Sequence, residues 1–154
     1  MKHLLSKRIA LSLLCLVWSA MSWADVVVVA HPDSPIRAMT ARQVSDLYLG
    51  RSRTLELGKS GESAAVLIYE HPTDSAVREA FFRSLNGMGL RQVNAYWARL
   101  RFSGEILPPM SLSDSHAVLN AVARNRNAIG YVDSSLVNDS VKVVLRLKEW
   151  LPHE

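Results

Sequence analysis

The chain has 154 residues, with 18 lysines and arginines against 14 aspartates and glutamates, which gives a formal net charge of +4. Three of the 18 basic residues lie within the first 24 positions, so residues 25–154 hold 15 basic and 14 acidic residues and a net charge of +1. This near-balance gives no basis for nucleic-acid binding, and we expect none. The single cysteine is Cys15, so residues 25–154 carry no disulfide or thiol chemistry.

Residues 1–24 have the pattern of a secretory signal peptide. Basic residues stand at positions 2, 7 and 8, an apolar run follows over residues 9–18, and small residues precede Asp25. The apolar run is shorter than the ~20 residues that a membrane span needs. We therefore predict cleavage after Ala24, a periplasmic domain of residues 25–154, and no membrane span after cleavage. An uncleaved N-terminal anchor is the alternative.

The first half of this domain begins with a β-branched run over residues 25–30, which predicts a strand buried on both faces. Thr40 and Gln43 have the spacing of a capping box, so we expect a helix there that Gly50 closes. Residues 51–61 are polar and contain glycine, which favours a solvated loop. A second strand is expected over residues 64–69.

The second half of the domain is predicted to hold most of the helices. One helix begins at Ser75, a second follows the break at residues 86–89, and a third begins after residues 111–114. Residues 128–132 read as a buried strand in which Gly130 marks a close backbone approach. One turn of helix at residues 133–135 and a last strand at residues 141–145 complete the order. The apolar stripes of the second and third helices are Val93, Tyr96, Trp97 and Leu100, and Val118, Leu119 and Val122.

This alternation of strands and helices predicts an α/β fold. We expect a single three-layer α/β/α domain around a small mixed, partly parallel sheet of about four strands.

The start of the helix at Ser75 is a candidate binding site. The first N–H groups of a helix have no partner within it, and the helix dipole is positive there. The hydroxyls of Thr73 and Ser75, with the N–H groups of Ala76 and Val77, therefore suit an anion. The alternative is ordinary capping, in which Asp74 or Ser75 bonds back to the backbone.

Five landmarks occur in an order that resembles the phosphate-binding proteins of ABC transporters. They are the valine run from residue 26, Pro35, residues 47–50, the helix opening at residues 75–81, and residues 128–132. The resemblance covers nearly all of residues 25–147, but in that family these landmarks belong to one lobe of a two-lobed protein. It implies a single lobe that binds phosphate or a related oxyanion without a cofactor. The implied partner is an ABC transporter permease or another envelope protein.

The resemblance also implies which residues would bind the anion. The family's anion loop reads arginine, two variable residues, glycine, serine, glycine and threonine, and Ser75 falls on the serine. Ala76 replaces a glycine and Val77 the threonine, so the Ser75 hydroxyl and the backbone N–H groups of Ala76 and Val77 remain. His71 falls where the arginine would be and, if protonated, would partly substitute for it.

The Arg78 side chain could turn back toward the same loop and contact the anion. The simpler interpretation is that Arg78 forms an exposed ion pair with Asp74 or Asp46.

Two other functions stay open on the sequence. An interaction or accessory protein of the envelope would keep the single-lobe fold without a ligand. An enzyme would need more than the trio Ser75, His71 and Asp74, which lacks the glycine-flanked elbow of hydrolases. The histidines at positions 31, 71, 116 and 153 have no metal-ligand spacing. We predict no catalytic residue, no metal site and no enzyme activity.

Overall fold

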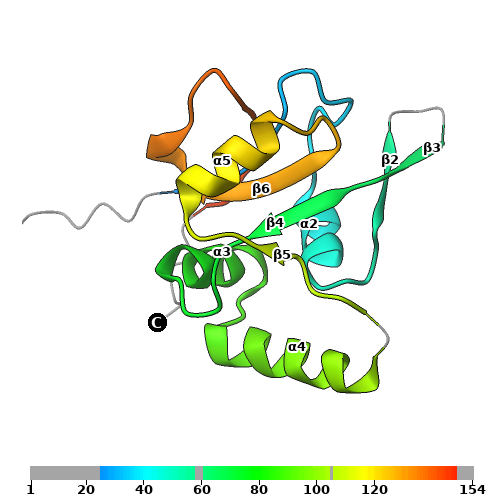
Figure 1. Cartoon of the computed structure of the whole chain (residues 1–154), viewed down its shortest axis with the longest axis vertical. Coiled ribbons are helices and arrows are strands. Elements are labelled where there is room, and N and C mark those ends of the chain that lie inside the picture. The colour runs from blue at the N-terminus through cyan, green and yellow to red at the C-terminus, as the bar shows by residue number, and fades with distance from the viewer. Residues whose placement is uncertain (1–24, 58–60, 105, 149–154) are drawn as a thin grey trace, which may run out of the picture.

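The computed structural model describes residues 25–57, 61–104 and 106–148 (Figure 1). The predicted signal peptide at residues 1–24 lies outside this range. Within the described residues, no helix is both long and apolar enough to cross a bilayer.

Five strands form a mixed sheet in the order β5-β4-β6-β1-β7. The strands are Met110–Ser111, Leu67–Glu70, Ala128–Asp133, Val26–Ala30 and Lys142–Arg146, respectively. The pairs β4·β5 and β4·β6 are parallel, whereas β1 runs antiparallel to both β6 and β7. The predicted small, partly parallel sheet is confirmed, with five strands where about four were expected.

Helices cover both faces of this sheet, so the α/β/α layering is confirmed (Figure 1). Helices α2 (Ala41–Tyr48), α3 (Ala76–Asn86) and α4 (Leu90–Ser103) pack into one core with alternate residues of β1, among them Val28. Helix α5 (Ser115–Ala123) packs against the other face, where it meets Val27 and Val29. Strand β1 is therefore buried on both faces, as its β-branched run predicts.

Local signals set the helix boundaries. The Gln43 N–H donates to Thr40 Oγ1 at 3.2 Å and the Thr40 N–H donates to Gln43 Oε1 at 2.9 Å, which is a complete capping box. Gly50 adopts a φ of 69° just beyond the end of α2. At residues 133–135 the expected turn is the short helix η2 (Ser134–Leu136), where the Asp133 carboxylate accepts from the Ser135 N–H.

The expected loop over residues 51–61 is wrong for residues 54–57, which form a β-hairpin with residues 62–65, whereas residues 58–60 lie outside the described range. Strand β2 (Thr54–Leu57) pairs with β3 (Glu62–Ala65) in an antiparallel ladder that extends away from the main sheet (Figure 1). Leu55 and Leu57 alternate with polar residues, and Leu55 is buried against the α2 side of the core. Because the surrounding residues are polar, the alternation of apolar and polar side chains that marks a strand was not recognised in the sequence. The single strand expected at residues 64–69 is consequently divided between β3 and β4.

Candidate functional site

Two strand-to-helix loops meet at one edge of the sheet. Strands β4 and β5 are parallel, so their carboxyl ends lie at the same edge. Residues 71–75 connect β4 to α3, and residues 112–114 connect β5 to α5. The positive ends of two helices are therefore joined to this edge, a common place for ligands in α/β folds.

The start of α3 combines a cap with open donors. Ser75 is the N-cap, and its hydroxyl oxygen accepts from the Arg78 N–H at 3.4 Å, so the capping interpretation is confirmed for Ser75. Within the part of the chain that the structure describes, the N–H groups of Ala76 and Val77 bond to no acceptor. A capping hydroxyl still carries its own proton and can donate it. The cap therefore does not exclude an anion beside Ser75, Ala76 and Val77.

Thr73 is exposed in the same loop, but its carbonyl oxygen is fixed from the inside. Asn94 Nδ2 of α4 donates to this oxygen at 3.2 Å, and Arg78 NH1 donates to it at 3.4 Å. Asp74, the other expected cap, is exposed and makes no capping bond to the start of α3. The loop is thus held by its backbone and leaves the Thr73 side chain at the surface.

His71 is buried instead of facing an anion as a charged group. Only 3% of its surface is exposed, its Nε2 lies 2.9 Å from Ser115 Oγ, and its ring lies 4.8 Å from that of Tyr131. Burial lowers the pKa of His71 from 6.5 to about 4, although nearby Asp114 acts in the opposite direction. His71 is therefore neutral at pH 7. The expectation that a protonated His71 replaces the missing arginine is wrong.

The contacts of His71 also bear on the hydrolytic trio. Its Nε2 is bonded to Ser115, and no contact joins it to Ser75 among the described residues; its Nδ1 is buried without a partner there. Ser115 lies 44 positions further along the chain, so sequence reasoning missed it. The sequence predicts a helix start after residues 111–114, yet only the sheet pairing brings that start to His71.

The shifted pKa of His71 predicts a specific pH dependence of stability. Because the folded pKa is below the unfolded one, the unfolded chain takes up the proton first as the pH falls through 6.5 toward about 4. Stability contributed by neutral His71 is complete above pH 6.5 and is lost across this window. Between pH 7 and pH 4.5, we expect the protein to lose about 2 kcal/mol more unfolding free energy than the His71→Gln variant. Urea denaturation at both pH values measures this difference.

Exposed His116 supplies the matched control for the loss of an imidazole at the neighbouring helix start, so His116→Gln is measured at the same two pH values. Equal losses for the protein and for His71→Gln would contradict the buried, neutral imidazole.

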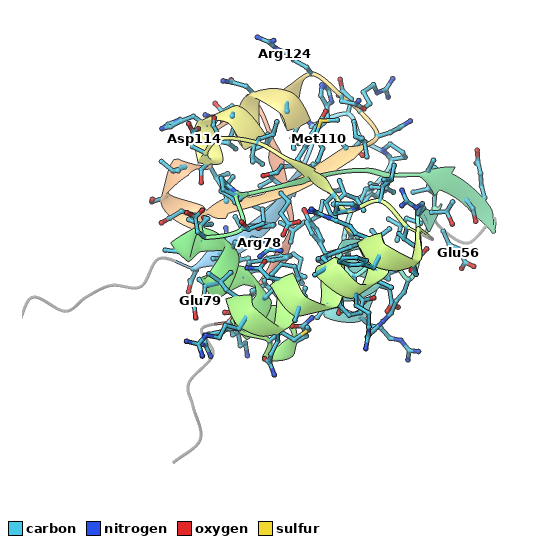
Figure 2. The ribbon with its side chains drawn as sticks, turned by 60° about the horizontal axis from the view of Figure 1, so that its bottom comes forward. Glu56, Arg78, Glu79, Met110, Asp114 and Arg124 are labelled. Carbon is cyan, nitrogen blue, oxygen red and sulfur yellow. The ribbon has the colours of Figure 1, made fainter. Side chains whose placement is uncertain are left out.

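Arg78 lies in the interior, bound by an ion pair. It is 2% exposed, its Nε donates to Glu70 Oε1, and its NH1 donates to Asn94 Oδ1 at 2.7 Å. Figure 2 shows Arg78 within the body of the molecule, whereas Glu79, the next residue of α3, lies at the outer surface. Burial raises the pKa of Glu70, and the Arg78 guanidinium opposes that shift.

This geometry overturns the expectation of an exposed ion pair between Arg78 and Asp74 or Asp46. Asp46 is instead near two other arginines. Its Oδ1 lies 3.5 Å from Arg51 NH1, and its Oδ2 lies 4.0 Å from Arg42 Nε. The reason is helical phase: Arg78 occupies the same face of α3 as Phe82, and its guanidinium carbon lies 5.2 Å from the centre of that ring.

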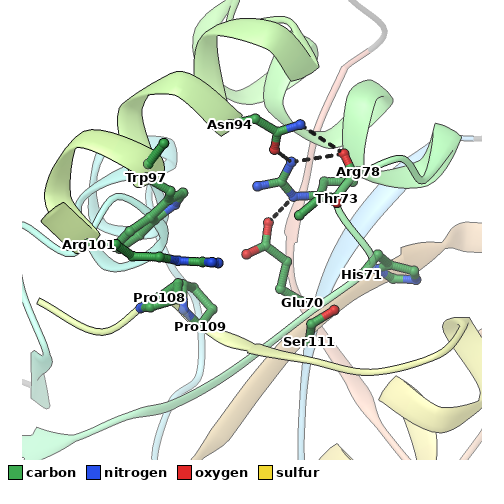
Figure 3. A pocket seen from close by; sticks show the side chains of 11 residues that line it. Glu70, His71, Thr73, Arg78, Asn94, Trp97, Arg101, Pro108, Pro109 and Ser111 are labelled. Atoms are coloured by element: carbon green, nitrogen blue, oxygen red, sulfur yellow. Dashed lines mark hydrogen bonds and ion pairs between the residues drawn. The ribbon is translucent and has the colours of Figure 1, made fainter.

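A cavity of about 270 Å³ opens beside this ion pair, between α4 and the β4–β5 edge (Figure 3). We call it the α4 pocket. Its walls combine the buried pair with exposed Arg101 and with apolar groups. The lining residues are Glu70, His71, Thr73, Arg78, Asn94, Trp97, Ala98, Arg101, Pro108, Pro109 and Ser111. Where the chain is described, no group of three or more histidine, cysteine, aspartate or glutamate side chains is placed to hold a metal ion.

A mixed sheet between two helical layers, with helix starts gathered at one edge, is an arrangement that this chain shares with part of several solved transport proteins. One is a Clostridium perfringens protein assigned to the phosphate ABC transporter substrate-binding proteins and solved with bound phosphate, with a TM-score of 0.61 and 23% identity. Others are an ABC-type phosphate transport receptor from Vibrio cholerae, with a TM-score of 0.59 and 15% identity, and PstS from Borrelia burgdorferi, with a TM-score of 0.59 and 10% identity.

The matches cover most of this chain and less than half of each solved structure. Each covers 79% of this chain but only 44%, 45% and 46% of the Clostridium, Vibrio and Borrelia chains, respectively. The matched part of the chain thus spans less than half the length of each of these proteins. The predicted likeness to one lobe of this fold is confirmed. Neither the family models nor the curated proteins include a match to this sequence.

Proposed function

We propose that this protein is a solute-binding module that contacts phosphate or a related oxyanion at the start of α3. The Ser75 hydroxyl and the N–H groups of Ala76 and Val77 are the direct contacts, and Thr73 stands beside them. The observation that carries the proposal is that these two N–H groups have no acceptor among the described residues, at a helix start with a positive dipole. The bound phosphate of the Clostridium protein supports the choice of ligand.

The electrostatics of the site predict weak binding. His71 is neutral at pH 7, and the Arg78 guanidinium is already paired with Glu70, so neither of them brings a free positive charge to the loop. The exposed Asp74 carboxylate repels an approaching anion. A single lobe also offers about half of the contacts that a two-lobed protein makes. Binding therefore depends on two N–H groups, one hydroxyl and the helix dipole.

The cellular setting belongs to the same proposal. Residues 1–24 direct export, and the domain works in the periplasm. There it binds an ABC transporter permease or another envelope protein. The module binds its solute without transforming it, in keeping with the transport proteins among its structural neighbours.

Ser75→Ala tests the site. Removing the hydroxyl deletes one hydrogen bond to the anion, and we expect calorimetry to show about tenfold weaker phosphate binding. Loss of the cap should lower the unfolding free energy by about 1 kcal/mol, so circular dichroism must confirm that the variant remains folded.

Ser84→Ala is the matched control, because Ser84 lies in the same helix away from its start. Its phosphate affinity should equal that of the original protein. Equal affinity in folded Ser75→Ala would reject the site, and absence of phosphate binding in the original protein would reject this ligand.

A second candidate function has one observation in its favour. Phe102, Leu107 and Met110 are 96%, 77% and 53% exposed, and the last two line an apolar groove of about 450 Å³ at the β4–β5 edge. Exposed apolar groups of this size favour an envelope interaction or accessory role. Cross-linking in the intact envelope would test it, since a protein that stays monomeric and uncross-linked has no such partner.

A further inference from the structure

The outer face of α4 is basic and has an aromatic side chain at its centre. Its exposed side chains follow the helical spacing and are Arg91, Ala95, Ala98, Arg99 and Phe102. The buried residues of the helix, Val93 and Trp97, lie on the opposite side. In Figure 2, α4 lies in front of the other elements, with this outer face toward solvent.

The charge of this face is positive and is not balanced by nearby carboxylates. The sequence of α4 contains three arginines and no acidic residue. Among the described residues, neither Arg91 nor Arg99 forms an ion pair, and Arg99 lies 5.9 Å from the centre of the Tyr96 ring. Glu105, the next acidic residue along the chain, lies outside the described residues, and residues 90–105 hold three basic residues against this one. The face therefore complements a negatively charged surface.

Phe102 projects from the middle of this face. It is 96% exposed, and it lines neither of the two cavities described above. Beside it, the carbonyl oxygens of Leu100 and Arg101 accept from Ser103 Oγ at 2.8 Å and from the Gly104 N–H at 3.2 Å. These bonds remain when water is displaced, which lowers the cost of moving this end of α4 into an apolar boundary.

We propose that the outer face of α4 docks on the surface of an anionic lipid bilayer. Arg91 and Arg99 bind lipid phosphates, and the Phe102 ring enters the boundary between headgroups and acyl chains. A ring that projects from a convex helix favours lipid over a folded protein partner, because a fluid headgroup layer needs no matching cavity. The docking depends neither on the oxyanion site at Ser75 nor on the groove that Leu107 and Met110 line.

A fluorescent label at position 102 tests the proposal. Cys15→Ser removes the single cysteine of the chain, and Phe102→Cys then accepts a polarity-sensitive label. The labelled protein is titrated with vesicles of two parts phosphatidylcholine and one part phosphatidylglycerol. We expect a saturable blue shift of the emission, no shift with vesicles of phosphatidylcholine alone, and loss of the shift at high salt, which screens the arginines.

Arg124→Cys, labelled in the same Cys15→Ser background, is the matched control for the label. Arg124 is exposed and follows α5, on the side of the molecule opposite α4 (Figures 1 and 2). Its emission should not shift. The control also accounts for residues 1–24, which are basic and apolar and, where they remain attached, bring any label near the bilayer.

Substitutions on the face test its chemistry. With the label at position 102, the double variant Arg91→Gln with Arg99→Gln should weaken binding about 25-fold, about fivefold for each arginine. Arg124→Gln is its matched control and should bind as the labelled protein does. With the label moved to the same face by Ala95→Cys, Phe102→Ser should weaken binding at least tenfold, because the apolar ring is lost.

The outcomes separate this docking from the other proposals. Ser75→Ala should leave vesicle binding unchanged. The proposal is overturned by no blue shift at position 102, by an equal shift at position 124 or with neutral vesicles, or by unchanged affinity in the double arginine variant. If the blue shift is absent and Phe102→Ser removes cross-links in the intact envelope, the face belongs to a protein partner instead.

Discussion

Replacing Arg78 with leucine is expected to lower the unfolding free energy by about 3–5 kcal/mol, the largest effect of any single substitution considered for this protein. Arg78 and Glu70 are 2% and 4% exposed, so the variant leaves a carboxylate buried without its counter-charge. It also removes the donor to Asn94 Oδ1, which lies 2.7 Å from Arg78 NH1. Urea denaturation at pH 7 measures the loss.

Arg42→Leu is the matched control. Arg42 is also a helical arginine near a carboxylate, but its side chain is 93% exposed and lies 4.0 Å from Asp46. We expect a change of less than about 1 kcal/mol. The double variant Arg78→Leu with Glu70→Leu should be more stable than Arg78→Leu alone, because it removes the unpaired charge. A cost for Arg78→Leu no larger than that for Arg42→Leu would show that the buried pair contributes little.

The Arg78 network gives this residue a positioning role near the start of α3 and beside the α4 pocket. Its guanidinium ties the end of β4, through Glu70, to the Thr73 carbonyl in the loop before α3 and to Asn94 of α4. The same loop leads to the open N–H groups of Ala76 and Val77. Arg78 therefore holds the loop from inside, and its charge is not available to an anion at the surface.

Much of the fold could be predicted because its signals are local. The capping box at Thr40 and Gln43, the cap at Ser75 and the β-branched run of β1 each depend on neighbours within a few positions. Such contacts survive in any arrangement of the other elements. The number and order of the major helices follow from these signals, and so does the start of α3, where the candidate oxyanion site lies.

The errors arose where contacts between different elements decide the outcome. His71 loses its charge because Ser115 and Tyr131, 44 and 60 positions away, enclose it. Arg78 is paired with Glu70, which comes from the preceding strand, so the folding of β4 against α3 turns an apparent surface arginine into a buried one. The β2–β3 hairpin follows the same rule, since its strands are stabilised by each other. Trp97 was predicted as core from helical spacing, and only the folded packing shows its unsatisfied N–H.

Gly130→Ala is expected to lower the unfolding free energy by about 3 kcal/mol, the second largest effect. The sequence predicts a close approach at Gly130, and the structure confirms it. A Cβ placed there would lie 2.4 Å from Val118 Cγ1 and 3.2 Å from Val122 Cγ2, both on α5. Gly130 lies within β6, which pairs with strands on both sides, so the backbone has little freedom to retreat and α5 must shift.

A second substitution on α5 separates steric overlap from a general loss of stability. Val118→Ala removes the nearest methyl group, so adding it to Gly130→Ala should recover part of the loss, and a double-mutant cycle measures that coupling.

A displacement of α5 also moves Ser115, the hydrogen-bond partner of His71. The pKa of His71 in Gly130→Ala should therefore rise from about 4 toward 6.5, as water gains access to the ring. Thermodynamic additivity of the two substitutions, or an unchanged unfolding free energy in Gly130→Ala, would show that α5 does not press against β6 at this point.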